Sequence, residues 1–207
     1  MGLIDISPLL RVGMSVFPGD AAFRAARTFT IGPDCPVNVA EIAMSTHCGA
    51  HADAPLHYDP NGASIDRLDL ADFIGPARVI DARGESPLCG FDEIAAALDD
   101  APPRLLFRLM ERIDPMVWPT GFRTLAPDTI ERLALRGTRL IGVDVPSVDP
   151  ETSKDLPSHM VCNAHDLRII ENLLLADVAP GDYELIALPL NLSGLDAAPV
   201  RAVLRRL

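Results

Sequence analysis

Residues 45–57 read STHCGAHADAPLH and hold three of the five histidines of the chain, together with one aspartate. The imidazoles belong to His47, His51 and His57, and the carboxylate belongs to Asp53. Imidazole nitrogens and carboxylate oxygens are donors that suit zinc and neighbouring divalent metals. The spacing H-x3-H-x-D-x3-H therefore predicts a metal site. The alternative is a polar loop whose histidines cap nearby backbone groups.

The chain must bend inside this motif if one ion is to meet several of its donors. A helix would turn Asp53 away from His47 and His51, and Pro55 would interrupt it. An extended strand would hold His47 and Asp53 about 20 Å apart, at roughly 3.3 Å per residue. Gly49 lies among small residues and permits a sharp turn, so we expect the bend there.

His57 follows Asp53 by four residues, beyond a rigid Ala-Pro step. Its reference pKa of about 6.5 suits a proton shuttle, but the spacing equally allows a further metal ligand. A third interpretation is a buried histidine that is hydrogen-bonded beside Tyr58. The spacing alone leaves these roles open.

The longer string HCGAHADAPLHYDPNGASI, residues 47–65, resembles the signature of the cyclase family of metal-dependent hydrolases, written H-x-G-T-H-x-D-x-P-x-H. Similar segments run through most of the chain: DISPLL (5–10), VFPGD (16–20), CPVNVA (35–40), GPARVIDARG (75–84), LAPDTIERLALRGTRLIGVDVPSVDP (125–150) and DYELIALPLNLSGLDAAPVRAVL (182–204). Within this family the chain is most similar to the arylformamidases.

The resemblance implies metal ligands at His47, His51, Asp53, His159 and Glu171. The last two are the ends of HMVCNAHDLRIIE, and they would allow Asp53 and Glu171 to bridge or flank two ions per subunit. Zinc is the expected metal, and manganese or cobalt would also suit mixed nitrogen and oxygen ligands. His165 lies in the same stretch but off the family's metal position, so we expect a structural or supporting role for it.

The function implied by the resemblance is hydrolysis of N-formyl-L-kynurenine to L-kynurenine and formate, in tryptophan degradation through the kynurenine pathway. A metal-activated water would attack the formyl carbonyl, and His57 would deliver a proton to the departing arylamine. One alternative is a related cyclic-amide hydrolase, such as an isatin hydrolase. A less favoured alternative is a non-catalytic metal-binding protein with the same fold.

Phe17 is the expected substrate-binding residue, in the turn Val-Phe-Pro-Gly-Asp at positions 16–20. Arylformamidases usually carry tryptophan at this place. Phenylalanine can still stack on an aryl ring, but it lacks the indole N–H and offers less area. The alternative is that Phe17 only packs beside a tight turn.

Size and composition fit a single hydrolase domain over residues 1–207. The chain is 48% hydrophobic, enough for a substantial core. A net charge of −11 without a basic tract disfavours nucleic acid as a partner. No segment has the length of a membrane span or the pattern of a signal peptide. Four scattered cysteines indicate reduced thiols, so we expect a cytoplasmic enzyme. The family resemblance implies that its partner is a small aryl formamide substrate.

Strand-like and helical segments alternate, which predicts an α/β fold. Strands are expected at residues 3–6, 37–44, 78–81, 104–109, 139–144 and 184–190, and helices at 91–98, 127–136 and 197–207. The prolines of residues 146–157 indicate a loop, either a connector or a lid over the site. The family resemblance implies a swivelling β/α/β architecture with a mixed sheet and flanking helices, assembled as a homodimer.

Overall fold

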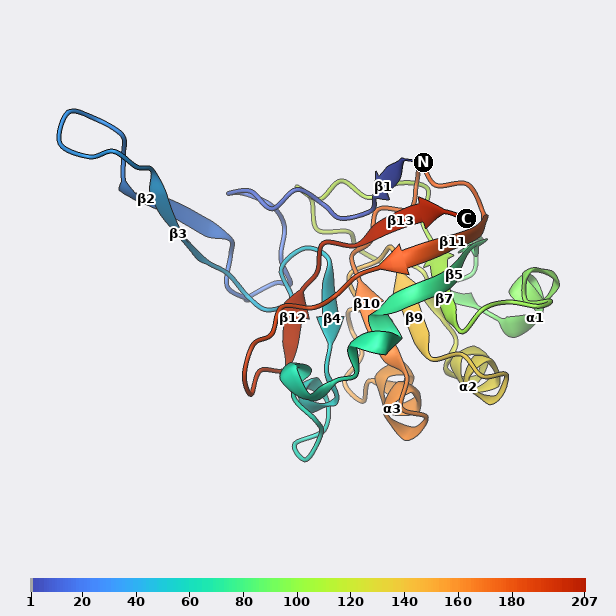
Figure 1. Ribbon diagram of the computed structural model, residues 1–207. Coiled ribbons are helices and arrows are strands. Elements are labelled where there is room, and N and C mark those ends of the chain that lie inside the picture. The colour runs from blue at the N-terminus through green and yellow to red at the C-terminus, as the bar shows by residue number, and fades with distance from the viewer. Residues whose placement is uncertain (1) are drawn as a thin grey trace.

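A mixed nine-stranded sheet organises the computed structural model, which describes residues 2–207 (Figure 1). Its strands in spatial order are β1 (Leu3–Asp5), β13 (Val203–Arg206), β11 (Gly181–Ile186), β5 (Ile74–Asp81), β7 (Arg104–Arg108), β9 (Leu140–Val143), β10 (Arg168–Glu171), β4 (His51–Asp53) and β12 (Ala197–Pro199). The four central strands β5, β7, β9 and β10 are parallel, and the outer strands are antiparallel. The mixed α/β prediction is confirmed.

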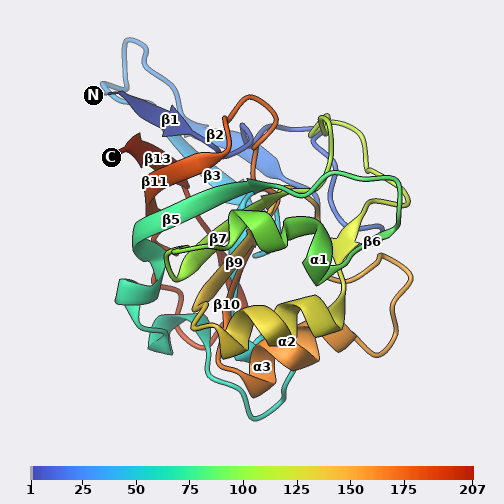
Figure 2. The same cartoon turned by 90° about the vertical axis from the view of Figure 1, so that its right-hand side faces the viewer.

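Helices cover one face of the central strands (Figure 2), and β7, β9 and β10 are buried almost throughout. These helices are α1 (Phe91–Ile94), α2 (Pro127–Leu135) and α3 (Pro157–Ala164). In β7, Leu105 and Phe107 pack into the core on the helix side, whereas Leu106 joins the core on the other side. This alternation is the two-residue period of a pleated strand.

Shorter elements connect these layers. Strands β6 (Leu88–Cys89) and β8 (Thr124–Leu125) pair beside α1 and α2, and 3-10 turns lie at η1 (Pro55–His57), η2 (Ile65–Arg67), η3 (Leu70–Phe73) and η4 (Ala95–Ala97). Helix α2 begins at Pro127, as expected for proline in a first helical turn. Within residues 2–207, no helix is long and apolar enough to cross a membrane.

A separate hairpin extends away from the sheet (Figure 1). It pairs β2 (Arg24–Phe29) with β3 (Val39–Ala43), and every residue of both strands is exposed. The exposed side chains include Phe29, Val39 and Ile42. A two-stranded hairpin with no buried face is marginally stable by itself, so this arm is suited to contact another surface.

The helix predicted over residues 197–207 is wrong. Those residues form β12 and β13, separated by a short turn. Ala202 and Leu204 are fully buried while Arg201 and Arg205 are exposed, which is the alternation of a strand. Pairing with β4, β1 and β11 therefore overrides the helical propensity of alanine, leucine and arginine.

Candidate metal centre

The bend expected in the histidine motif is present at Gly49. Its φ is +71°, and a side chain there would collide with Leu10. Beyond the bend, His51 and Asp53 are two residues apart on β4, so both point to the same face. The predicted sharp turn is confirmed, and it brings His47 back to Asp53, with 3.2 Å between His47 Nδ1 and Asp53 Oδ1.

Strand pairing brings Glu171 to the same place. In the antiparallel ladder of β4 and β10, Glu171 lies directly opposite His51. Their side chains meet with 3.3 Å between His51 Nε2 and Glu171 Oε2. The backbone N–H of Val148 donates to the other oxygen of Glu171 at 2.8 Å, which fixes the carboxylate.

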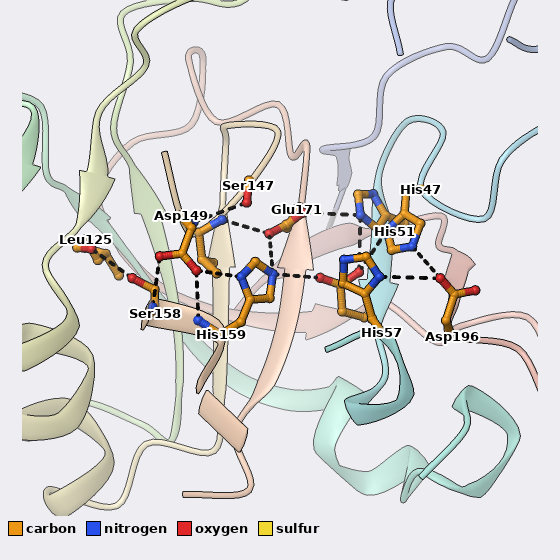
Figure 3. A network of polar contacts seen from close by, with 12 residues as sticks. His47, His51, His57, Leu125, Ser147, Asp149, Ser158, His159, Glu171 and Asp196 are labelled. Atoms are coloured by element: carbon orange, nitrogen blue, oxygen red, sulfur yellow. Dashed lines mark hydrogen bonds and ion pairs between the residues drawn. The ribbon is translucent and has the colours of Figure 1, made fainter. Parts of the chain in front are cut away.

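Helix α3 supplies His159, which lies beside Glu171 (Figure 3) and whose Nε2 faces the carboxylates of both Glu171 and Asp53. It lies 3.5 Å from Asp53 Oδ2 and 3.7 Å from Glu171 Oε1. The other oxygen of Asp53 lies 3.4 Å from His51 Nε2. Each carboxylate thus has one oxygen toward His51 and one toward His159.

The buried donors fit a divalent metal better than they fit one another. His51 Nδ1 donates to the carbonyl of Gly49 at 2.9 Å, which leaves Nε2 with a free lone pair. Among the described residues, Nε2 of His51, Nε2 of His159 and both oxygens of Asp53 are buried without a hydrogen-bond partner. Orphaned polar atoms are costly in a protein interior. Their convergence is the arrangement of ligands around an ion.

Asp149 orients His159. Its Oδ2 accepts a hydrogen bond from His159 Nδ1 at 2.7 Å, and its two oxygens accept the backbone N–H groups of Ser158 and His159 at 2.9 and 3.0 Å. Because a carboxylate only accepts, Nδ1 of His159 carries the proton and Nε2 is free. Carboxylates behind metal-binding histidines act in this way.

His57 lies at the rim of the cluster, at the end of η1. Its ring centroid is 4.2 Å from that of His47 and 5.8 Å from that of His159. Asp196 contacts both His47 and His57: its Oδ2 lies 2.8 Å from His47 Nε2 and 3.5 Å from His57 Nδ1. The structure therefore brings His57 to the cluster, and Asp53, His57 and His159 also satisfy the geometry of a three-ligand group.

The electrostatics of the cluster favour a cation. Burial alone would lower the pKa of His51 and of His159, but carboxylate contacts raise both values to about 10. For His51 the contacts are Asp53 and Glu171, and for His159 they begin with Asp149 and Asp53. The pKa of His57 is instead lowered, chiefly by burial. Positive charge, whether of a proton or of a metal ion that takes its place on Nε2, is therefore stabilised beside the carboxylates and disfavoured at His57.

The cluster opens into a cavity of about 310 Å³. Its wall includes His47, His57 and Glu171 together with Phe17 and Trp118. The structure thus places the predicted substrate-binding residue, Phe17, in the same cavity as the predicted ligands. The loop of residues 146–157 also borders the cavity through Pro146, Ser147 and Leu156.

The Cyclase family model matches residues 4–150. The chain belongs to the cyclase family. The family predicted from the histidine motif is confirmed, and the metal-ligand pattern of residues 47–57 lies inside the matched segment.

Relatives named kynurenine formamidase match this cyclase-family chain along nearly its whole length. The protein of Delftia acidovorans is 54% identical over 205 residues, which are 99% of this chain and 98% of that protein. The protein of Bordetella pertussis is 52% identical over 205 residues, with the same coverage of both chains.

Solved structures share the fold of this cyclase-family member. One described as a potential metal-dependent hydrolase with cyclase activity has a TM-score of 0.83 and 29% identity, covering 98% of this chain and 96% of its own. Isatin hydrolase A from Labrenzia aggregata has a TM-score of 0.83 at 22% identity, covering 98% of this chain and 93% of its own. The second likeness concerns the fold alone.

Sequence reasoning missed two residues that contact the cluster, Asp149 and Asp196. Asp196 meets His47 across 149 positions of sequence, so no local spacing connects them. Asp149 lies ten positions before His159, in a proline-rich loop without a recognisable pattern. His165 ends α3 and belongs to none of the three candidate ligand groups found among residues 2–207.

Proposed function

We propose that this chain is a kynurenine formamidase that hydrolyses N-formyl-L-kynurenine to L-kynurenine and formate, a step of tryptophan degradation. Relatives of that name at 52–54% identity over nearly the full length support the substrate. The observation that carries the chemistry is the buried set of orphaned histidine and carboxylate atoms in a cavity that also holds aromatic side chains.

The ligands we propose for the metal are His47, His51, Asp53, His159 and Glu171. Asp53 and Glu171 each direct one carboxylate oxygen to His51 and the other to His159. This arrangement supports two ions per subunit, with the two carboxylates between them. Zinc suits this mixed donor set, and manganese or cobalt are the alternatives. When bound, such ions lower the pKa of a coordinated water and polarise a carbonyl oxygen.

His57 is the residue we propose for proton transfer. It lies at the cavity wall, half-exposed, while the other histidines of the cluster are more buried. The attacking water forms a bond to the formyl carbon and gives up a proton, which the imidazole accepts. The carbon–nitrogen bond then breaks, and the imidazole returns the proton to the arylamine nitrogen. Asp196 Oδ2, 3.5 Å from His57 Nδ1, is close enough to stabilise the protonated imidazole.

We further propose that the enzyme is a cytoplasmic homodimer. The exposed apolar side chains of the β2–β3 hairpin support contact with a second copy. Light scattering of the purified protein tests this, and a monomer at working concentrations would contradict it.

The decisive experiment measures kynurenine release from N-formyl-L-kynurenine by the purified protein as isolated, after chelation, and after zinc is restored. We expect turnover that chelation abolishes and zinc recovers. Absence of turnover by the fully metallated protein would overturn the proposal. Because Phe17 is smaller than the usual tryptophan, isatin is the second substrate in this assay, and ring opening of isatin alone would indicate a cyclic-amide hydrolase.

A further inference from the structure

Trp118 is the one tryptophan of the chain, and it lies against Phe17. The two rings meet edge to face, with centroids 5.5 Å apart and planes at 79°. Phe17 is 52% exposed, and both side chains line the cavity that contains His57 and Glu171. The aromatic wall of the cavity therefore comes from two segments about a hundred residues apart in sequence.

Hydrogen bonds join the loops that carry these rings. The carbonyl of Pro115 accepts both the backbone N–H of Ser15 at 2.9 Å and its hydroxyl at 3.1 Å. Trp118 Nε1 donates to Glu151 Oε2 at 2.8 Å, so the indole is also tied to the 146–157 loop. Since its N–H is occupied, Trp118 contributes to the cavity chiefly through its apolar ring.

The remaining lining combines apolar side chains with the acidic side chains of Asp20 and Asp144. Within residues 2–207, the side chains around this cavity include no lysine or arginine. Its apolar surface includes Met14, Ile113 and Leu174. Indole is electron-rich, and an aryl ketone ring is electron-poor, so offset or edge-to-face contact between them is favourable.

We propose that Trp118 is a specificity-determining residue that, together with Phe17, binds the aryl ring of the substrate. This inference rests on the proposed function for the identity of the aryl formamide. Indole is the larger of the two rings and therefore offers the larger face for stacking. Glu151 acts as a positioning residue, because it holds the indole at the cavity wall.

Trp118 fluorescence provides a test independent of turnover, because the wild-type chain contains no other tryptophan. The metal-loaded enzyme is titrated with L-kynurenine, which carries the aryl ring but no longer has the formamide. We expect saturable shortening of the fluorescence lifetime. L-Alanine, an amino acid that lacks the aryl ring, is the control ligand and should leave the lifetime unchanged.

Kinetics of substitutions provide the second readout. Trp118→Leu should raise KM for N-formyl-L-kynurenine about 10-fold, the size expected for loss of an aromatic contact. Its kcat should stay within about 2-fold, because binding away from the reacting atoms affects KM rather than kcat. Trp118→Phe should restore part of the loss. Val117→Ala, in the same loop but outside the cavity lining, is the control.

Substitutions of Glu151 separate positioning from folding. Glu151→Gln keeps an oxygen acceptor for the indole and should resemble the wild type, whereas Glu151→Ala should raise KM by less than Trp118→Leu does. If Trp118→Leu does not fold, the comparison of Trp118→Phe with Glu151→Ala still tests the proposal. Unchanged KM in these two variants would overturn it.

The two readouts distinguish this inference from the proposed function. A lifetime change with L-kynurenine, in an enzyme that does not hydrolyse N-formyl-L-kynurenine, would overturn the function and support aryl binding at Trp118. Turnover with an unchanged lifetime and unchanged KM in the Trp118 variants would overturn the inference and leave the function standing.

Discussion

His159 and Asp149 form a hydrogen bond of 2.7 Å between Nδ1 and a carboxylate oxygen, and this bond determines which ring nitrogen faces the carboxylates of Asp53 and Glu171. Asp149 is itself held by the backbone N–H groups at the start of α3. The proton of the imidazole is therefore fixed on Nδ1, and Nε2 faces Asp53 and Glu171 with its lone pair.

Asp149→Asn should weaken metal binding by about 10-fold to 100-fold, the usual effect of removing a carboxylate behind a metal-binding histidine. Competition with a chromogenic chelator measures the affinity. Asp155→Asn is the matched control, since Asp155 is an exposed acid in the same loop. Equal affinity in the Asp149 variant and the control would show that Asp149 has no role in metal binding.

His57→Ala and Asp53→Ala should have different defects. Loss of His57 should leave the metal content unchanged and lower kcat by at least about 100-fold, the range of general acid–base catalysis. Loss of Asp53 should lower the metal content itself, because both of its oxygens face histidine nitrogens. Elemental analysis and turnover at saturating substrate are measured on the same samples. A metal-depleted His57 variant would make His57 a ligand instead.

Three of the four central strands, β5, β7 and β9, could be predicted because they have a strong local signal, whereas β10 was not predicted. Residues 104–109 and 139–144 are apolar runs that begin after proline or glycine segments, and they form β7 and β9. Among the outer strands, β1 and β11 overlap the predicted segments 3–6 and 184–190, whereas β4, β12 and β13 were not predicted as strands. Residues 197–207 are rich in residues that suit a helix, and only pairing with β1, β4 and β11 makes them strands.

The residues that meet at the cluster could be predicted where they lie close in sequence or follow the family pattern, as for His51, Asp53 and His159. Asp149 and Asp196 could not be found in this way, because each reaches the cluster through the fold. The position of Glu171 depends on the register of two strands. Glu171 faces His51 only because β10 and β4 pair antiparallel with these two residues opposite each other.

Metal removal should destabilise the fold. Without an ion, the oxygens of Asp53 and Nε2 of His51 and His159 are buried and have no hydrogen-bond partner. A ligand at about 1,000 times its Kd stabilises the native state by about 4 kcal/mol. Chelation should therefore lower Tm, and added zinc should restore it. Asp53→Ala is the control, and a Tm shift of wild-type size in that variant would contradict binding at this site.

The free energy of unfolding should also depend on pH through the buried carboxyl of Asp144. Asp144 follows β9 and is only 6% exposed, and this burial raises the pKa of its carboxyl to about 7. The backbone N–H of Leu109 donates to the carboxyl at 2.8 Å and partly opposes the rise in pKa. The unfolded carboxyl has its ordinary pKa near 4. Between about pH 4 and pH 7 the unfolded chain releases a proton that the folded chain keeps, so the free energy of unfolding falls as pH rises.

Asp144→Asn should remove this dependence, since an amide does not ionise and its oxygen can still accept from Leu109. Relative to wild type, the free energy of unfolding of the variant should rise by roughly 2.5 kcal/mol between pH 5 and pH 8, because each pKa unit corresponds to about 1.4 kcal/mol. Urea denaturation of both proteins at the same zinc concentration measures the difference, in which the titration of the other groups cancels. A difference that does not change with pH would mean that Asp144 is already ionised in the folded protein at pH 5.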